Sequence, residues 1–208
     1  MLVFADANLT LFAVPKTGST AYHLALKSRA DMALTRRAGF KHMPVRRYER
    51  FVLPMLERGF GLRPERAAVM RDPLDSMRSW YRYRQRPARQ GSLRSAAGIG
   101  FSEFVLAALE EKPPPWAVPG NQLSFLASGD GKVHVEHLFA YERIEVFHAF
   151  LEARLGESVT VRDRNVSPPA ETSISPDAEA RFRAARAGEF ALHGRILQAG
   201  GHLRQTTA

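Results

Sequence analysis

Short continuous apolar runs alternate along the chain with longer segments in which apolar residues recur at spacings of three and four. The first pattern is typical of buried strands and the second of amphipathic helices. Strands alternating with helices predict an α/β fold of three layers, with a mostly parallel central sheet flanked by helices. The predicted strands are 9–14, 37–41, 66–70 and 133–139, and the predicted helices are 19–29, 44–58, 73–86, 103–111, 122–127, 143–155 and 177–195.

Residues that begin or end helices support several of these boundaries. Asp72-Pro73 places a proline in the first turn of its helix, Ser102 is suited to cap the next helix, and Gly156 is suited to end another. The segments 87–100 and 163–175 are rich in small, polar or proline residues and are predicted to be loops, the first of them mobile. The last residues of the chain are expected to fray.

The composition is that of one globular domain spanning residues 1–208, in which 45% of the residues are hydrophobic. There is no run of about 18 apolar residues, so no membrane span is expected. The first residues lack the basic and apolar stretches of a secretory signal, so none is expected. The chain has no cysteine, which excludes disulfides and thiolate metal sites and favours a cytoplasmic location.

The formal charge is +9, and 25 of the 30 basic residues are arginines. Arginine is suited to bidentate binding of phosphate or sulfate. A basic chain of this kind can bind nucleic acid, an anionic membrane or a small polyanionic ligand, or can simply have a solvated basic surface. Charge alone does not select among these partners.

A buried strand at 9–14 leads through one glycine into the start of a helix at Ser19. The first backbone N–H groups of a helix lack internal partners and lie at the positive end of its dipole, so such a junction binds phosphate. Lys16 adds a charge, and Ser19 and Thr20 add hydroxyl groups. This P-loop-like arrangement differs from the ATP-binding loop, in which the lysine follows the last glycine. Here Lys16 precedes Gly18, and this order does not favour a kinase.

A second junction of strand and helix places Arg71 at the carboxyl end of the strand 66–70. Open α/β sheets bind ligands at this end of their strands. Ser79 follows about two helical turns later, where its hydroxyl can face the anion that Arg71 faces. The alternative is a local ion pair of Arg71 with Asp72 and a surface hydroxyl at Ser79. The two junctions together favour an anion site.

The two segments resemble motifs of the sulfotransferases that use 3′-phosphoadenylyl sulfate (PAPS). The first motif, P-K-[TS]-G-[TS]-[TS], is matched by Pro15-Lys16-Thr17-Gly18-Ser19-Thr20, and the second, R-[DE]-P with a later serine, by Arg71-Asp72-Pro73 and Ser79. The resemblance implies that Arg71 and Ser79 bind the 3′-phosphate of the donor. It implies that the 5′-phosphosulfate is held by Lys16, Gly18, Ser19 and Thr20.

A third segment, Lys41-His42-Met43-Pro44, resembles the K-x-H-x-P of cytosolic sulfotransferases, with the lysine moved next to the histidine. In that family the histidine is the catalytic base, so the resemblance implies this role for His42. A histidine titrates near neutral pH and can accept the proton of a hydroxyl group. A capping or surface histidine is the alternative. The short distance from the first motif is more like the compact bacterial and carbohydrate-type members.

Further matches concern the nucleotide. Tyr141 follows a late strand, as does a tyrosine that touches the adenine in family members, and ordinary packing is the alternative. Arg164, or Arg162, lies in a late loop that resembles one in carbohydrate-type members and could close over the nucleotide, although a solvated loop is the simpler interpretation. Two features depart from the family. Ala21 replaces a tryptophan that stacks on adenine, and a glycine-rich adenine loop near the C-terminus is absent.

The sequence therefore predicts in-line transfer of a sulfuryl group from PAPS to a hydroxyl or amine acceptor, releasing adenosine 3′,5′-bisphosphate (PAP), with no metal. The acceptor is expected to be a small molecule or a glycan, including anionic ones, and nucleic acid is not expected. One alternative is a P-loop nucleotide kinase that uses ATP and Mg²⁺. Another is a non-catalytic polyanion-binding protein. The feature that supports it is an arginine cluster interleaved with Tyr81 and Tyr83: Arg82, Arg84, Arg86, Arg89 and Arg94.

Overall fold

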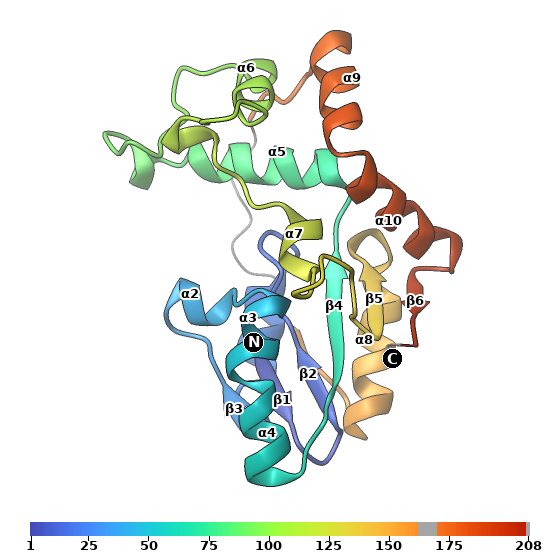
Figure 1. Ribbon diagram of the computed structural model, residues 1–208. Helices are drawn as coiled ribbons and strands as arrows, with labels where there is room; N and C mark the ends of the chain where they lie inside the picture. The colour runs from blue at the N-terminus through green and yellow to red at the C-terminus, as the bar shows by residue number, and fades with distance from the viewer. Residues whose placement is uncertain (162–169, 207–208) are drawn as a thin grey trace.

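The computed structural model describes residues 1–161 and 170–206 and has an α/β fold built on one mixed sheet of six strands (Figure 1). The strand order is β3-β1-β2-β4-β5-β6. Only β2 with β4 and β4 with β5 pair in parallel, and the outer pairs are antiparallel. The prediction of a mostly parallel sheet is therefore wrong outside the three central strands. The strands are β1 (Leu2–Phe4), β2 (Leu9–Leu11), β3 (Met32–Ala33), β4 (Glu65–Met70), β5 (His137–Ala140) and β6 (His202–Arg204).

Helices connect the strands and cover both faces of the sheet. Within residues 1–161 and 170–206, none of them is long and apolar enough to cross a membrane. The helices are α1 (Ser19–Leu26), α2 (Ala38–Lys41), α3 (Val45–Phe51), α4 (Leu53–Phe60), α5 (Pro73–Arg84), α6 (Phe101–Ala107), α7 (Gln122–Leu126), α8 (Ile144–Leu155), α9 (Pro176–Ala185) and α10 (Ala187–Gln198). Short 3₁₀ turns lie at η1 (Pro87–Arg89), η2 (Pro115–Ala117) and η3 (Tyr141–Arg143).

Side chains alternate along the strands between two hydrophobic cores, one on each face of the sheet. Leu138 lies in a core with Tyr48 of α3 and Ile196 of α10. The next residue, Phe139, lies in the other core with Phe147 of α8. Helices α3, α4, α7 and α10 therefore form one layer, the sheet the second, and α1 and α8 the third.

The three central strands end at the same edge of the sheet because they are parallel. In the register of these pairs Leu11 lies opposite Ala67, and Met70 lies opposite Ala140. The chain leaves these strands through residues 12–18, at Arg71 and at Tyr141. This edge therefore brings three of the predicted ligand-binding segments together, which is how α/β sheets build ligand sites.

Beyond this edge lies a smaller hydrophobic cluster, which α5, α6 and α9 form above β4 in Figure 1. Met77 and Tyr81 of α5 pack there with Phe104 of α6 and Phe182 of α9. The hydroxyl of Tyr81 donates a hydrogen bond to the carbonyl of Ile99 over 2.7 Å. The cluster holds α5 beside the carboxyl ends of the strands, and α5 carries Ser79, one of the predicted site residues.

Several predicted helices have different limits. The segment 37–41 is not a strand, because the N–H groups of Lys41 and His42 donate helical bonds and form α2. The predicted helix 44–58 is two helices, since Pro54 has no N–H to continue the bonding pattern. The predicted helix 177–195 is likewise divided, at Arg186, whose φ of −113° and ψ of 21° are not helical.

The strand predictions were wrong toward both ends of the chain. Residues 2–4 form β1, which was not predicted, and residues 202–204 form β6 instead of fraying. Of the predicted strand 133–139, only the last part belongs to β5, and Val133 forms an isolated bridge with Ala127.

Ser102 is not the cap of α6, because Gly100 precedes that helix and the hydroxyl of Ser102 accepts a hydrogen bond from the N–H of Ser175.

Candidate functional site

The loop between β2 and α1 has an unusual backbone. Lys16 and Gly18 both have φ of 70°, in the left-handed region, and a non-glycine residue is uncommon there. The hydroxyl of Thr17 donates to the carbonyl of Val14 over 2.9 Å, and that of Ser19 donates to the same carbonyl over 3.3 Å. Both hydroxyl groups therefore stabilise the loop itself. The groups left for an anion are the first N–H groups of α1 and the charge of Lys16.

The ammonium group of Lys16 lies over aromatic rings of α5. Its Nζ is 4.6 Å from the ring centre of Tyr83 and 5.7 Å from that of Trp80. Burial and, to a smaller extent, the charges of Arg86, Arg71 and Arg84 together lower the pKa of Lys16 to about 8. A cation held among other cations is suited to bind an anion, because the anion would relieve their repulsion.

Arg71 joins three segments at the end of β4. Its Nε donates to Asp75 over 2.6 Å, and its Nη1 donates to the main-chain carbonyl of Lys16 over 3.2 Å. Its guanidinium carbon lies 4.4 Å from the ring centre of Tyr141. The strand end that carries Arg71 is thus bonded directly to the loop that carries Lys16, and the two predicted halves of the anion site are neighbours.

Tyr141 follows β5 and reaches back to the same place. A Cβ atom added to Gly18 would lie 3.5 Å from Cε2 of its ring. The ring therefore packs against the glycine of the loop on one side and is covered by the guanidinium of Arg71 on another. The carboxyl ends of β2, β4 and β5 meet at this tyrosine.

Ser79 lies half-buried on α5, eight residues after Arg71. Residues four apart share a face of a helix, so Asp75 and Ser79 follow Arg71 along one face, and Tyr83 comes one turn later. Since Asp75 contacts Arg71 and Tyr83 contacts Lys16, Ser79 lies on the face between these two contacts.

His42 follows α2 and contacts the loop from the other side. Its Nδ1 is 2.7 Å from the carbonyl oxygen of Ala13. A carbonyl only accepts hydrogen bonds, so Nδ1 carries the proton of the neutral ring and Nε2 retains its lone pair. Burial lowers the pKa of His42, the bond to Ala13 partly opposes this, and the charge of Lys41 lowers it again. The neighbouring Lys41 donates to the hydroxyl of Thr20 over 2.6 Å, which fastens α2 to α1.

Three polar residues to which the sequence analysis gave no role support the strand ends, and two of them, Gln122 and Glu189, are buried. The amide of Gln122 accepts from the N–H of Arg71 over 2.9 Å and donates to its carbonyl over 2.8 Å. Glu189 accepts from the N–H of Gln122 over 3.0 Å, and burial raises its pKa. Glu142 accepts from the N–H of Asp72 over 2.7 Å and lies 2.8 Å from Nε2 of His193. Only Glu142 had a signal in the sequence, its position next to Tyr141.

His23 of α1 is buried directly behind the loop, with 2% of its surface exposed. Among the described residues neither of its ring nitrogens has a hydrogen-bond partner. It lines a cavity of about 10 Å³ together with Thr17 and Ser19, which is close to the space one water molecule needs. Burial lowers the pKa of His23 to about 3, so its ring is neutral at ordinary pH.

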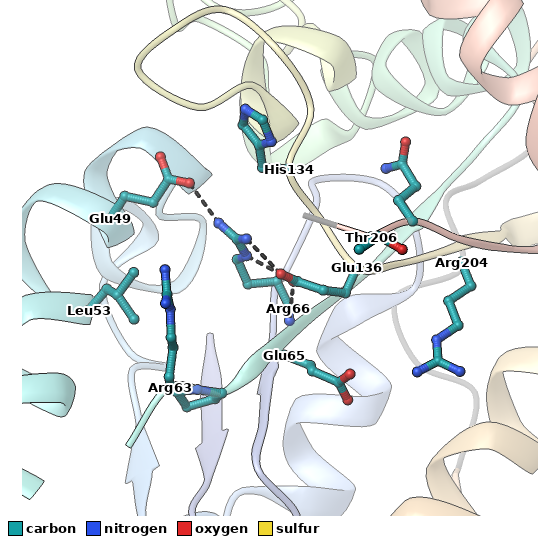
Figure 2. A pocket seen from close by; sticks show the side chains of 11 residues that line it. Glu49, Leu53, Arg63, Glu65, Arg66, His134, Glu136, Arg204 and Thr206 are labelled. Carbon is teal, nitrogen blue, oxygen red and sulfur yellow. Dashed lines mark hydrogen bonds and ion pairs between the residues drawn. The ribbon is translucent and has the colours of Figure 1, made fainter. Parts of the chain in front are cut away.

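A much larger cavity, of about 820 Å³, opens at the opposite end of β4. Figure 2 shows Arg66 at its centre, between Glu49 and Glu136. The guanidinium donates to Glu136 over 2.6 Å and to Glu49 over 2.7 Å, and Glu49 also accepts from the hydroxyl of Ser128. Arg66 is thus paired with two carboxylates, and its bond to Glu49 connects α3 to the sheet. Because this cavity contains none of the predicted site residues, size alone does not identify the anion site.

The structure thus brings together all of the predicted site residues that it describes. Arg164 lies outside the described residues, and so does Arg162. Within residues 1–161 and 170–206, no group of three histidine or acidic side chains is placed to hold a metal ion. The residues at the shared edge of the sheet are Pro15, Lys16, Thr17, Gly18, Ser19, Thr20, His42, Arg71, Ser79 and Tyr141.

Comparison of the chain with protein-family models, with curated proteins and with solved structures finds no match. The function is therefore argued from the geometry of this site and from the motifs that occupy it.

Proposed function

We propose that the protein is a PAPS-dependent sulfotransferase, in which the site at the carboxyl ends of β2, β4 and β5 binds the donor. The observation that carries the proposal is the hydrogen bond from Arg71 to the carbonyl of Lys16. It makes neighbours of two cationic strand ends, as a ligand with two separate phosphate groups requires. The donor PAPS and its product PAP are such ligands.

The residues present suit the two ends of this nucleotide. The N–H groups at the start of α1 and the ammonium of Lys16 are suited to the 5′-phosphosulfate. Arg71, at the end of β4, and Ser79, on α5, are suited to the 3′-phosphate. Tyr141 packs between the loop and Arg71, where its ring edge can meet the adenine in place of the tryptophan that Ala21 replaces.

His42 has the arrangement of a general base. Its Nδ1–H is held by the carbonyl of Ala13, which leaves the lone pair of Nε2 to accept a proton from the acceptor hydroxyl or amine. The acceptor atom then bonds to sulfur as the bond from sulfur to the 5′-phosphate oxygen breaks. Lys16 and the N–H groups of α1 stabilise the negative charge on the departing phosphate. His42 holds the proton during the transfer and then releases it to solvent.

Two other functions compete for the same site. A nucleotide kinase would bind ATP with Mg²⁺ and would use the same loop. A basic polyanion-binding protein would use surface arginines without Lys16 or Arg71. The motif order, with Lys16 before Gly18, and the second phosphate position at Arg71 favour the sulfotransferase. The lack of cysteine favours a cytoplasmic enzyme, and its acceptor is a small molecule or glycan rather than a nucleic acid.

Calorimetric titration tests the proposal. PAP is expected to bind the wild-type protein without added metal, and ATP with Mg²⁺ is expected to bind at least tenfold more weakly. Binding of ATP–Mg²⁺ in preference to PAP would support the kinase instead. Incubation with PAPS labelled in its sulfuryl group, followed by a screen of phenol, sugar and amine acceptors, then detects transfer directly.

A further inference from the structure

The end of α5 and the turn after it carry a group of cations around one aromatic ring. Lys16, Arg86 and Arg89 lie over the ring of Tyr83, with their charged groups 4.6, 5.2 and 4.8 Å from its centre. Arg89 also donates a hydrogen bond to the hydroxyl of Tyr83. An aromatic ring attracts each cation, but like charges gathered on one ring repel one another.

Arg84, next to this ring, is buried, and no carboxylate of the described residues forms an ion pair with it. Only 6% of its surface is exposed, and its Nη2 donates to the carbonyl of Val118 over 3.1 Å. Its Nε has no hydrogen-bond partner among the described residues. Its guanidinium carbon lies 5.5 Å from the ring centre of Trp80. Burial of a charge is unfavourable unless the charge is paired, so this arginine also favours an anion nearby.

No carboxylate in residues 1–161 and 170–206 forms an ion pair with Arg84 or Arg89. By contrast, Arg71, just before the start of the same helix, is paired with Asp75 over 2.6 Å. The two ends of α5 therefore differ. Among the described residues, Arg71 is paired with a carboxylate, whereas Arg84 and Arg89 are not.

The position of this group, defined by Arg84, Arg86 and Arg89, separates it from the donor phosphates. Arg71 lies just before α5 and Ser79 on its second turn, and Lys16 contacts the helix farther along, at Trp80 and Tyr83. The arginines continue from that point to η1, on the far side of Lys16 from Arg71. The proposed sulfuryl group lies near Lys16, so a molecule that approaches it from this end meets the arginines.

We infer that Arg84, Arg86 and Arg89, with Tyr83, form an anion subsite for the acceptor, and that the acceptor carries a carboxylate, sulfate or phosphate group. Arginine is suited to such groups because its planar fork donates two parallel hydrogen bonds. The inference rests on the proposed function, because it assigns the second substrate of the same reaction. It selects acidic acceptors over neutral phenols, sugars and amines.

The test uses short-chain dextran sulfate as an anionic probe, unsulfated dextran of equal length as the neutral one, and protein saturated with PAP. The variant R86Q/R89Q is expected to bind dextran sulfate at least about tenfold more weakly than wild type, with PAP affinity within about twofold. The matched control is R46Q/R47Q, which removes two exposed arginines of α3 and the same charge. It is expected to retain most of the affinity for dextran sulfate.

Three outcomes would overturn the inference. Equal losses in the two double variants would indicate a diffuse effect of net charge. Loss of PAP affinity in R86Q/R89Q would assign these arginines to the donor. Equal binding of the sulfated and the neutral dextran would exclude an anion subsite. If wild-type protein failed to bind PAP, the proposed function would fail, and the dextran titrations without PAP would still decide on the subsite.

Discussion

The guanidinium of Arg71 donates a hydrogen bond of 3.2 Å to the main-chain carbonyl of Lys16. That carbonyl belongs to a residue with φ of 70°, a conformation that costs a non-glycine residue roughly 1 kcal/mol. Arg71 thus has two tasks. It stabilises the strained loop that holds the amino-terminal motif, and its guanidinium lies at the site proposed to bind the nucleotide. The second motif therefore positions the first.

Two substitutions of Arg71 distinguish the contribution of its planar guanidinium from the contribution of its charge. Arg71→Lys keeps the charge but loses the planar fork, and we predict that PAP affinity falls by one to two orders of magnitude. Arg71→Ala loses both and is expected to lower the affinity further. Calorimetric titration measures both changes. Arg58→Ala, at an exposed position of α4, is the control and should bind PAP as wild type does. Equal affinity of Arg71→Lys and wild type would contradict the proposed role.

The lowered pKa of Lys16 leads to a prediction of how PAP binding depends on pH. Its pKa in the free protein is lowered to about 8, so above pH 8 the free protein loses the charge that the phosphate requires. The phosphate groups of PAP are fully ionised there, because their second pKa is about 6. Affinity should therefore fall as pH rises from 7.5 to 9.5, by up to about tenfold per unit above 8, with proton uptake on binding.

The variant Lys16→Arg isolates that dependence, because arginine remains charged throughout this range. Its affinity for PAP is expected to be lower than that of wild type at pH 7.5 but nearly constant up to pH 9.5. Titration in two buffers of different ionisation enthalpy measures the proton uptake directly. A fall in affinity that is just as steep in Lys16→Arg would assign the titration to another group.

Local sequence patterns predicted the elements around the candidate site better than they predicted the outer strands of the sheet. The strand 66–70, the helix beginning at Pro73 and the loop 15–18 depend on short apolar runs, a proline and a glycine, and all three signals are local. The antiparallel strands β1 and β6 depend on partners distant in sequence, and β6 has only three residues. Their short runs have no distinctive periodicity, so tertiary pairing alone determines them.

The supporting residues of the site were not predictable for a related reason. Gln122 lies 51 residues from Arg71, and Glu189 lies 67 residues from Gln122. A lone glutamine or glutamate on a helix has the same sequence pattern whether it faces solvent or a buried main-chain group. Only the packing of α7 and α10 against the end of β4 turns these side chains inward.

Gly18 allows a prediction about the loop backbone. Alanine at φ of 70° is strained, and its methyl group would lie 3.5 Å from the ring of Tyr141, an ordinary contact. Gly18→Ala is therefore expected to lower the free energy of unfolding by about 1 kcal/mol through its backbone alone, and to weaken PAP binding by distorting the loop. Urea denaturation and calorimetry measure the two effects.

The control for this variant is Gly59→Ala in α4, where a Cβ atom meets no other atom within 4 Å and φ is not positive. Alanine favours the interior of a helix, so this variant should be more stable than wild type by about 0.5–1 kcal/mol. A Gly18→Ala protein as stable as wild type would show that the loop tolerates another conformation.

The protonation of His42 predicts how the rate of the proposed sulfuryl transfer depends on pH. His42, the proposed base, would act in its neutral form, and its pKa is lowered from the ordinary value of 6.5. Activity should therefore rise with pH to a plateau, with the midpoint of the rise below pH 6.5. His42→Gln is expected to lower kcat by about 10²–10⁴ and to remove this acid limb. Rate measurements from pH 5 to 8 on both proteins make the comparison. Persistence of the same acid limb in His42→Gln would assign the base to another residue.

His23 predicts a loss of stability in acid. Its folded-state pKa of about 3 lies below the ordinary value of 6.5, so between these values the unfolded chain binds a proton that the folded protein excludes. Stability is therefore complete above about pH 6.5 and falls as pH decreases toward 3, by up to about 1.4 kcal/mol per pH unit from this residue. His23→Leu has no such proton to bind and removes a buried ring whose nitrogens lack partners among the described residues. We expect it to be at least as stable as wild type at pH 7 and to lose less stability on acidification.

Urea denaturation at pH 7, 6 and 5 measures how the free energy of unfolding changes with pH. The control His148→Gln replaces a histidine with 33% of its side chain exposed and should retain the wild-type slope. Parallel slopes for wild type and His23→Leu would show that the imidazole of His23 is hydrated or partnered in the folded protein.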